Sequence, residues 1–443
     1  MPSSRIVPLA LAAAGMLMAG CAATAPPIET ARAPLAANSF VVRNVRVFDG
    51  QRGIERVNVV VRDGRIASVG RETPPASLPM IDGSGRTLVP GLINSHGHAL
   101  TDAQLRNSLR FGVTTLLDMF TRVEFMQSHR VNVAQFNRSD LADMYSAGNP
   151  ATSPGGMGTQ FGLPFATIAG PQEAAAFVRA RRAEGSSYIK ILYEPGVDIV
   201  TSISLPTLRA AVAAARAEGL LSVVHVSSLE GARGAFTAGA DGLAHGFSDA
   251  LIDPLLARQM AARGMFVIPT LSISAALAGQ GTGPGLAVDS RISPYLTAGQ
   301  RTALNQPGPG NNDPMAGYLA RHNIQRALEN VRRLRAAGVR ILAGDDSPNL
   351  GTHGASMHGE LELLTRAGLT PAQALHAATR ATADAFRLPD RGRIEPGARA
   401  DFIIVDGNPL ADIRATRAIV RVFKNGYDVA RAPPPPVAAA RPQ

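Results

Sequence analysis

The central part of the chain, from about residue 91 to residue 391, alternates short apolar segments with Ala- and Arg-rich segments of helical pattern. This rhythm restricts the fold strongly, because neighbouring parallel strands need crossover connections that are usually helices. Helices are predicted at 172–184, 205–218 and 321–337, the last ending at Gly338. The sequence therefore predicts an α/β fold with a parallel barrel. Its strands are expected to end at Ile93-Asn94, Leu116–Asp118, near Ala142–Tyr145, and at Ile191, Val224-His225, Ala244-His245, Pro269-Thr270 and Leu342-Ala343.

Both ends of the chain are rich in strand-forming residues instead. Two half-sets of strands that flank one central unit predict a small β-sandwich, assembled from residues 39–90 and 392–430 beside a barrel of residues 91–391. An Ala- and Pro-rich tether, 22–38, precedes it, and a disordered Pro-rich tail, 431–443, follows it. The expected strands of the sandwich lie at 40–48, 57–61, 65–69, 401–406 and 419–423.

Residues 1–21 have the pattern of a secretory signal peptide, with Arg5 before an apolar stretch and Ala19-Gly20-Cys21 after it. Cys21 is the only cysteine, which excludes an intrachain disulfide, and its position resembles the lipidation site of a bacterial lipoprotein. Cleavage after Ala23-Thr24-Ala25 would instead release a soluble exported protein, and the apolar stretch is short for an uncleaved anchor. We expect an exported chain that is either periplasmic or attached to the membrane through lipidated Cys21.

The composition argues against nucleic acid as a partner. The formal net charge is +10, but the arginines are scattered through helical patches such as 179–182 and 332–335. A nucleic-acid surface combines a basic stripe with aromatic side chains, and the chain has no tryptophan. With 45% hydrophobic and 18% charged residues the chain is typical of a globular protein, and its charge indicates no partner.

Lys190 is unusual because only two of the 44 lysine and arginine residues are lysine. It lies inside the apolar run Tyr188-Ile189-Lys190-Ile191-Leu192, where a buried ammonium group is costly. An unprotonated amine can add CO2 to form a carbamate with two oxygens, whereas a guanidinium stays protonated and unreactive. The residue is therefore a candidate for bridging two metal ions. The alternative is a lysine that extends to the barrel end or pairs with a carboxylate.

Histidines follow other expected strands in positions that favour a metal site. His96 and His98 come directly after one strand, and residues two apart in extended chain point the same way. His225 and His245 close two further strands, and Asp346 follows the final strand. Active sites of parallel barrels form at the carboxyl ends of the strands, and imidazole is a common metal ligand. One such histidine is usually structural, but four in this order favour metal binding.

In these residues and their order along the chain, the sequence resembles the amidohydrolase superfamily. The resemblance is to binuclear members with a carboxylated lysine, in particular imidazolonepropionase-related and prolidase-like amidohydrolases, and it covers about residues 40–427. Besides Lys190, His225 and His245, it rests on the segments Val89–His98, Tyr188–Ile191, Gly344–Ser347, Gly359–Leu364, Gly368–Pro371 and Ile394–Asp401.

The resemblance implies a distorted (β/α)8 TIM barrel with a composite β-sandwich, and two divalent ions bridged by hydroxide. The donor set suits zinc best. Asp346 would be the catalytic proton shuttle. The family usually has Gly-Thr-Asp where this chain has Gly344-Asp345-Asp346, so Asp345 either orients a ligand histidine or is itself a ligand. One metal would be held by His96, His98, carboxylated Lys190 and Asp346, and the other by the second carbamate oxygen, His225 and His245.

Substrate-binding candidates are less well defined. Tyr193 follows Lys190 and is either a hydrogen-bond donor to substrate or part of the barrel rim. His353, in the loop after Asp346, is a further candidate, and His129 either reaches a substrate carbonyl or lines a solvated loop. The glycine-rich segment 155–162 is expected to lie over the mouth of the site. The remaining histidines, His322, His358 and His376, lie in helical patterns and are expected to be structural.

These features predict a metal-dependent hydrolase of amide bonds in small molecules such as dipeptides and N-acyl amino acids, acting through a metal-bridged hydroxide. A lactonase or esterase would use the same ligands. A mononuclear deaminase of aminated heterocycles is a second alternative, although such members generally lack the strand lysine. A non-catalytic surface lipoprotein is a third, but a binding scaffold has no need of six metal-site residues. Superfamily relatives often assemble, so the resemblance also allows a homo-oligomer.

Overall fold

The computed structural model describes residues 39–136, 138–162, 164–196, 201–307 and 323–432. The expected signal peptide and tether lie outside the described residues, as does most of the expected tail. Export of the chain and lipidation of Cys21 therefore stay predictions. Within the described ranges, no helix combines the length and the apolar character that crossing a membrane requires.

Parallel strands form the centre of the molecule, as the βα rhythm predicts. They form one sheet of five strands, in the order β13-β12-β11-β10-β9, and one of three, in the order β6-β7-β8. Each ladder in both sheets is parallel. The strands are β6 (Leu92–Gly97), β7 (Val113–Asp118), β8 (Asp143–Ser146), β9 (Ile189–Leu192), β10 (Ser222–His225), β11 (Gly242–Ala244), β12 (Phe266–Ile268) and β13 (Arg340–Ile341).

Hydrogen bonds and single bridges connect the two sheets at both of their edges. Beside β8 and β9, the amide of Ser187 donates to the carbonyl of Ser146 at 2.8 Å, and Ala151 forms a parallel bridge with Ile191. Beside β13 and β6, the amide of Ser95 donates to the carbonyl of Ala343 at 2.9 Å. The carboxyl ends of all eight strands are therefore brought into one region.

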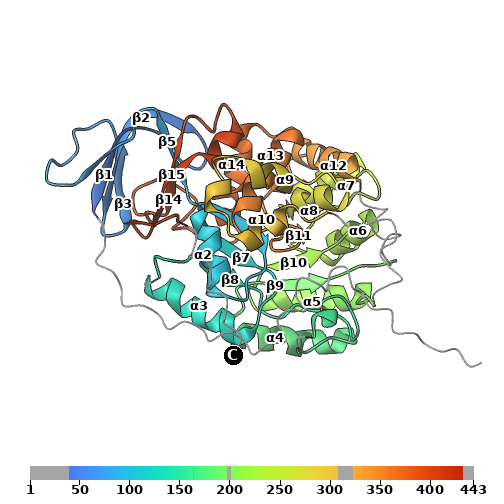
Figure 1. The fold of residues 1–443 in the computed structure, drawn as a ribbon. Coiled ribbons are helices and arrows are strands. Elements are labelled where there is room, and N and C mark those ends of the chain that lie inside the picture. Colours follow the sequence, from blue (N-terminus) through green and yellow to red (C-terminus); the bar gives the residue numbers. More distant parts are fainter. Residues whose placement is uncertain (1–38, 137, 163, 197–200, 308–322, 433–443) are drawn as a thin grey trace, which may run out of the picture.

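Helices follow the strands and cover the sheets on the outside (Figure 1). Their ends match local signals: Ser204, Ser228 and Asn323 accept hydrogen bonds from backbone amides as N-caps. The predicted helices at 172–184, 205–218 and 321–337 are confirmed in their described parts. The helices are α2 (Asp102–Arg110), α3 (Val123–Gln135), α4 (Ala174–Glu184), α5 (Leu205–Ala217), α6 (Leu229–Ala238), α7 (Pro254–Ala262), α8 (Leu271–Leu277), α9 (Gly283–Val288), α10 (Ala298–Leu304), α12 (Ile324–Ala336), α13 (Ala355–Arg366), α14 (Pro371–Ala377) and α15 (Arg380–Ala385), with short 3-10 turns η2 (Thr159–Phe161), η3 (Pro171–Glu173), η4 (Ser293–Tyr295) and η5 (Ile413–Arg417).

Alternation along the strands separates two apolar cores. On β9, Ile189 and Ile191 pack with the helices, whereas Tyr188 belongs to an inner cluster with residues of the other strands. Phe386, just after α15, closes this inner cluster, because its ring lies 5.1 Å from Tyr188 and 5.3 Å from Phe266. Side chains at positions 190, 192 and 194 therefore belong to the inner side of the chain and those at 191 and 193 to the helix side.

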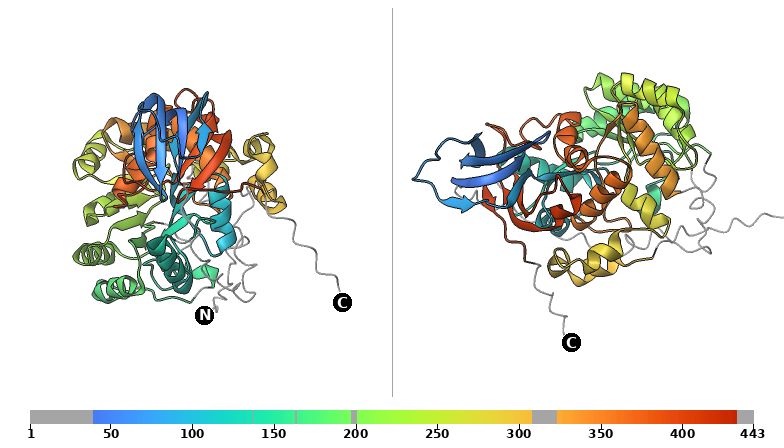
Figure 2. Two further views of the ribbon diagram at one scale, coloured as in Figure 1. Left: turned by 90° about the vertical axis from the view of Figure 1, so that its left-hand side faces the viewer. Right: turned by 90° about the horizontal axis from the view of Figure 1, so that it is seen from above.

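Strands from both ends of the chain form one further sheet, of eight strands (Figure 2, left, blue and red). Its order is β16-β15-β14-β5-β1-β2-β3, with β4 paired to β1. The strands predicted at both ends are confirmed, and three short ones, β4, β5 and β16, had not been predicted. The bounds are β1 (Phe40–Phe48), β2 (Gly53–Arg62), β3 (Arg65–Gly70), β4 (Met80–Asp82), β5 (Arg86–Pro90), β14 (Phe402–Asp406), β15 (Ile419–Lys424) and β16 (Tyr427–Asp428).

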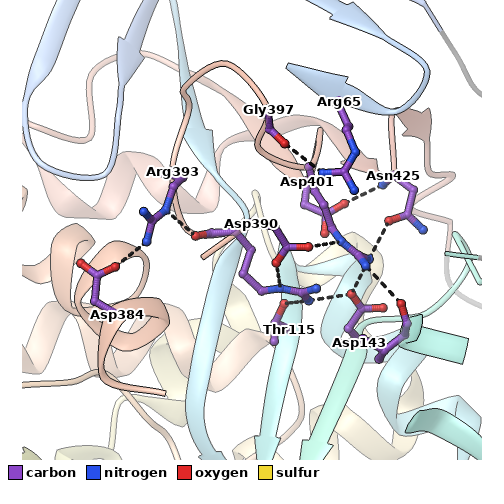
Figure 3. A network of polar contacts seen from close by, with 12 residues as sticks. Arg65, Thr115, Asp143, Asp384, Asp390, Arg393, Gly397, Asp401 and Asn425 are labelled. Carbon is purple, nitrogen blue, oxygen red and sulfur yellow. Dashed lines mark hydrogen bonds and ion pairs between the residues drawn. The ribbon is translucent and has the colours of Figure 1, made fainter. Parts of the chain in front are cut away.

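A buried network of charged groups connects this terminal sheet to the central strands (Figure 3). Asp143, the first residue of β8, accepts hydrogen bonds from Arg391 at 2.6 Å, from Lys424 at 3.1 Å and from Arg399 at 3.2 Å. Lys424 on β15 also donates to Asp401 at 2.9 Å, and its side chain is fully buried. One carboxylate at the amino end of a central strand therefore holds three cations that come from the C-terminal part of the chain.

Candidate metal centre

His96 and His98 lie at the carboxyl end of β6, as their spacing predicts. The ring of His96 is fully buried and that of His98 is 17% exposed, and their centroids are 5.4 Å apart. The ladder between β6 and β7 is irregular around these residues, between Asn94 and Gly97. Burial is the main reason why the pKa of His96 falls to about 3, and the nearby charge of Lys190 lowers it further. His96 is therefore neutral near pH 7, as a metal ligand must be.

Asp346 meets both imidazoles. Its Oδ1 lies 3.3 Å from Nε2 of His96 and 3.0 Å from Nε2 of His98. One possible ligand atom from each of the three residues can be chosen so that all three atoms lie within 4.8 Å of one another. Burial alone would raise the pKa of Asp346, but His96 and His98 hold that pKa well below its usual range. The backbone of Asp346 has a φ of 55°, in the left-handed region that non-glycine residues rarely adopt outside constrained sites.

Lys190 lies on the inner side of β9 and is 2% exposed. Burial lowers the pKa of its ammonium group to about 7, although Asp346 and Asp118 act in the opposite direction. A substantial fraction of the amine is therefore unprotonated near neutral pH, which is the form that can add CO2. The second lysine, Lys424, is equally buried but is held by carboxylates, so burial alone does not distinguish the two roles.

His225 and His245 lie at the ends of β10 and β11. Together with His96 and His98 they form an imidazole row in the order His98, His96, His245, His225. The ring centroids of His225 and His245 are 4.4 Å apart, and those of His245 and His96 are 4.5 Å apart. His245 follows an inner residue of its strand and would point outward by simple alternation, but its φ of 69° breaks that alternation. Nδ1 of His245 lies 2.8 Å from Oγ1 of Thr270, so Nε2 is left for another partner.

The hydrogen bond to Thr270 gives the first testable prediction. Thr270 itself has a φ of 42°, and its hydroxyl fixes the ring of His245 in one orientation. We expect Thr270→Val to weaken metal binding by about 10- to 100-fold, because partners of ligand histidines typically contribute this much. Thr270→Ser keeps the hydroxyl and is the matched control. Chelator competition on both variants measures the effect, and equal affinities would contradict the role of the hydroxyl.

The buried polar atoms of this region fit a divalent cation. Both ring nitrogens of His96 and Nε2 of His225 are buried and make no hydrogen bond to the described part of the chain. Leaving such atoms unpaired costs about 1–3 kcal/mol each, whereas a cation would use them as ligands. Imidazole and carboxylate donors suit zinc and also manganese, iron or cobalt. The residues that would hold it are His96, His98, Asp346, His225 and His245, together with the buried Lys190.

Two buried carboxylates near these residues had not been predicted. Glu194 lies two positions past β9, with Oε1 2.8 Å from Nε2 of His225. The two-residue period from Lys190 through Leu192 could have identified it. Asp118 ends β7, accepts hydrogen bonds from the amide of Ala99 at 2.9 Å and from the hydroxyl of Ser146 at 2.5 Å, and so fixes the chain next to His98. Burial raises the pKa of Asp118 to about 6.

Within the described residues, the side chain of Asp345 makes its hydrogen bonds with Asn94 and Ser347 and makes none with the candidate ligands. Its Oδ1 accepts hydrogen bonds from the side chain of Asn94 at 2.6 Å and from the amide of Ser347 at 2.9 Å. Asn94 in turn accepts from the amide of His96 at 3.1 Å, so Asp345 supports the backbone of the candidate ligand His96 instead of its ring. Gly344 allows this packing, because a Cβ there would lie 2.7 Å from the backbone nitrogen of His96.

The structure places two of the substrate candidates, Tyr193 and His129, in contact with neighbouring helices. Tyr193 packs against Gly234 of α6 on the helix side of β9, which matches the rim-packing alternative. His129 on α3 is 3% exposed, and its Nε2 lies 2.9 Å from Oδ1 of Asp102, which also pairs with Arg138 in a buried ion cluster. Tyr193 is thus held by a contact with α6, and His129 by an ion pair with Asp102 of α2.

His353 contacts the backbone of His98 and not its ring. Its Nε2 donates to the carbonyl oxygen of His98 at 2.8 Å, and burial lowers the pKa of His353 to about 4. This hydrogen bond supports the loop that carries His98, and contact of His353 with a substrate stays a prediction. The helical histidines His358 and His376 make hydrogen bonds with Thr416 and with the carbonyl of Gly50, as expected of structural residues, and His322 lies outside the described residues.

The chain is similar to known proteins over most of its length. The model of the amidohydrolase family matches residues 87–429. Imidazolonepropionase of Cereibacter sphaeroides is 29% identical over 398 residues, which cover 84% of this chain and 95% of that protein. Urease subunit alpha 1 of Streptomyces avermitilis is 35% identical, but over 88 residues, so the chain spans 16% of its length. A crystal structure of a candidate prolidase from Bifidobacterium longum is similar with a TM-score of 0.74 and 26% identity, over 90% of this chain and 96% of that one.

The family match covers most of the chain and includes each strand whose end carries a candidate ligand. The solved relative aligns over nearly the same length, which agrees with the parallel α/β core and with a TIM-barrel type of fold. The chain is therefore a member of the amidohydrolase family, with imidazolonepropionase and prolidase-like proteins among its relatives.

Proposed function

We propose that the protein is a binuclear metal-dependent amidohydrolase that cleaves amide bonds in small molecules, with dipeptides and N-acyl amino acids as the leading substrates. The observation that carries the proposal is the convergence of His96, His98 and Asp346 on one buried point, beside an imidazole row and a buried lysine. The prolidase-like relative supports the choice of dipeptides. Esters and lactones offer the same carbonyl chemistry and belong in the same substrate screen.

The finer features of the fold belong to the same proposal. We infer that the eight parallel strands close into a distorted (β/α)8 barrel of residues 91–391, with the hydrogen bonds of Ser187 and Ser95 across its two seams. Residues 39–90 and 392–430 would form the composite β-sandwich beside it. Its support is the apolar cluster between β1, β2, β14 and β15, which includes Phe40, Phe402 and Phe423.

The residues of the site can carry out amide hydrolysis. Divalent cations bound there would polarise the substrate carbonyl and make hydroxide available near neutral pH. The carboxylate of Asp346 is buried and ionised, so it can accept the proton that water loses as the new carbon–oxygen bond forms. Delivery of the same proton to the nitrogen completes the cleavage of the carbon–nitrogen bond. Neutral His96 and oriented His245 stay in place during this transfer.

Metal content tests the binuclear site. We expect about two ions per chain in the wild type and one or none in Lys190→Ala, because the carbamate would be lost. Lys190→Arg is the matched control for charge, since arginine keeps a cation but cannot be carboxylated, and it should lose metal as well. Added bicarbonate should raise the metal content of the wild type alone. One ion in all three proteins would overturn the proposal and favour a mononuclear deaminase.

Activity completes this test. Wild-type protein with two ions is expected to release free amine from a panel of dipeptides and N-acyl amino acids. Release of ammonia from cytosine-like or adenine-like compounds would instead support the deaminase. Full metal content without hydrolysis of any amide or ester in a broad panel would favour a binding scaffold.

A further inference from the structure

Glu194 is a carboxylate that the six expected ligands do not include, yet it lies among them. It is 3% exposed and follows β9 on the same side as Lys190. Its Oε1 is 2.8 Å from Nε2 of His225. The chain therefore places an extra negative oxygen directly beside one of the imidazoles that would hold the second cation.

One oxygen of the Glu194 carboxylate, Oε2, is held by a hydrogen bond, whereas the other, Oε1, has no hydrogen-bond partner among the described residues. The hydroxyl of Ser227 donates to Oε2 at 2.5 Å, and the backbone amide of Glu194 donates to Ser202 at 2.9 Å. Oε1 of Glu194 and Nε2 of His225 are both buried, and neither has a hydrogen-bond partner in the described part of the chain, despite their close approach. A simple carboxylate–imidazole hydrogen bond does not account for this geometry, and two unpaired buried atoms would be costly.

The separation is the one expected of two ligands on one ion. Bonds of about 2.0–2.2 Å at angles between a right angle and the tetrahedral angle place two ligand atoms about 2.8–3.5 Å apart. Asp346 Oδ1 lies 3.3 Å from Nε2 of His96 and 3.0 Å from Nε2 of His98, which is the same range. Nε2 of His96 also makes no hydrogen bond, so the pair of Glu194 and His225 repeats the pattern of the first pair of residues.

We propose that Glu194 is a direct ligand of the second cation, through Oε1 and beside His225 and His245. The inference rests on the proposed binuclear site and adds a seventh residue to it. Asp346, a carboxylated Lys190 and the bridging hydroxide would supply three negative charges against the four positive charges of two divalent ions, and Glu194 would supply the fourth. The site of the second cation would then have a carboxylate ligand whose formation does not require CO2.

The test uses Glu194→Gln in the full chain, loaded with Zn2+ or Co2+ alone. Glutamine keeps an oxygen that can accept from Ser227, so the shape of the residue is preserved. We expect the affinity for the second ion to fall by more than about 100-fold, the upper end of the effect of an indirect partner, with the first ion retained. Glu230→Gln is the matched control, because it removes an exposed carboxylate from the nearby α6 and should leave both ions bound.

Visible absorption of the Co2+ protein distinguishes a ligand from an orienting residue, because the intensity of these bands depends on coordination number. A changed spectrum at full Co2+ loading supports ligation by Glu194. Weaker binding with an unchanged spectrum would overturn the inference and leave Glu194 as an orienting residue of His225. Wild-type affinity in Glu194→Gln would also overturn it. A wild type with fewer than two ions would instead overturn the proposed binuclear site itself.

Discussion

Asp346→Asn is expected to lower kcat/KM for amide substrates by about 10²- to 10⁴-fold, the usual contribution of a positioned proton-transfer group. The carboxylate lies 3.3 and 3.0 Å from the two imidazoles of the β6 pair and is held in its ionised form. Asparagine has almost the same shape but cannot accept the proton of an attacking water. Steady-state kinetics on protein of known metal content measures the loss.

Asp345→Asn is the matched control for this prediction. The two aspartates are neighbours and both are buried, but Asp345 contacts Asn94 and Ser347 instead of the histidines. We expect a smaller decrease in kcat/KM for Asp345→Asn, below about tenfold. Full activity of Asp346→Asn with its metal retained would remove Asp346 from proton transfer. Loss of metal without a further loss of activity per bound ion would assign it to metal binding alone.

Asp143→Asn is expected to lower the free energy of unfolding by about 3–5 kcal/mol, because removing one partner of a buried ion pair leaves uncompensated charge. Asp143, labelled in Figure 3, is 6% exposed. It contacts Arg391, Arg399 and Lys424. These three cations belong to the C-terminal part of the chain, whereas Asp143 begins a central strand. Urea unfolding followed by circular dichroism measures the change.

The pH dependence of stability gives a second readout of the same carboxylate. Burial alone would raise the pKa of Asp143, but Lys424 and the two arginines hold it well below its ordinary value of 3.8. A depressed pKa in the folded state means that the stabilisation is complete above about pH 4 and is lost as the pH falls further. Asp143→Asn should therefore flatten the acid side of the stability curve.

An exposed ion pair supplies the control. Asp428 lies 2.9 Å from Arg421 on the terminal sheet, and both side chains are more than 40% exposed. Asp428→Asn should change the free energy of unfolding by less than about 1 kcal/mol, because solvent screens such pairs. Equal effects of the two substitutions would contradict the view that burial makes the Asp143 network important.

The sequence determined the local elements and the chemical character of the site. Alternation of strands and helices, cap residues such as Ser204 and Ser228, and the spacing of His96 and His98 all act over a few residues, so they can be read without the fold. The rarity of lysine indicated a functional role less reliably than the histidine spacing did. Lys190 and Lys424 are equally rare and equally buried, but Lys424 is held by two carboxylates in an ion network.

Only the tertiary structure decided which distant groups meet. The left-handed conformation of His245 brings its ring into the imidazole row, and the hydrogen bond with Thr270 fixes it there. Glu194 reaches His225 because β9 and β10 are neighbours in the sheet, and Asp143 meets Lys424 across 281 residues of sequence. Such contacts depend on strand order, register and backbone angles that packing of the whole chain selects. The sequence by itself thus determined which side chains end the strands, and the fold decided which of them lie together and which support the structure from other contacts.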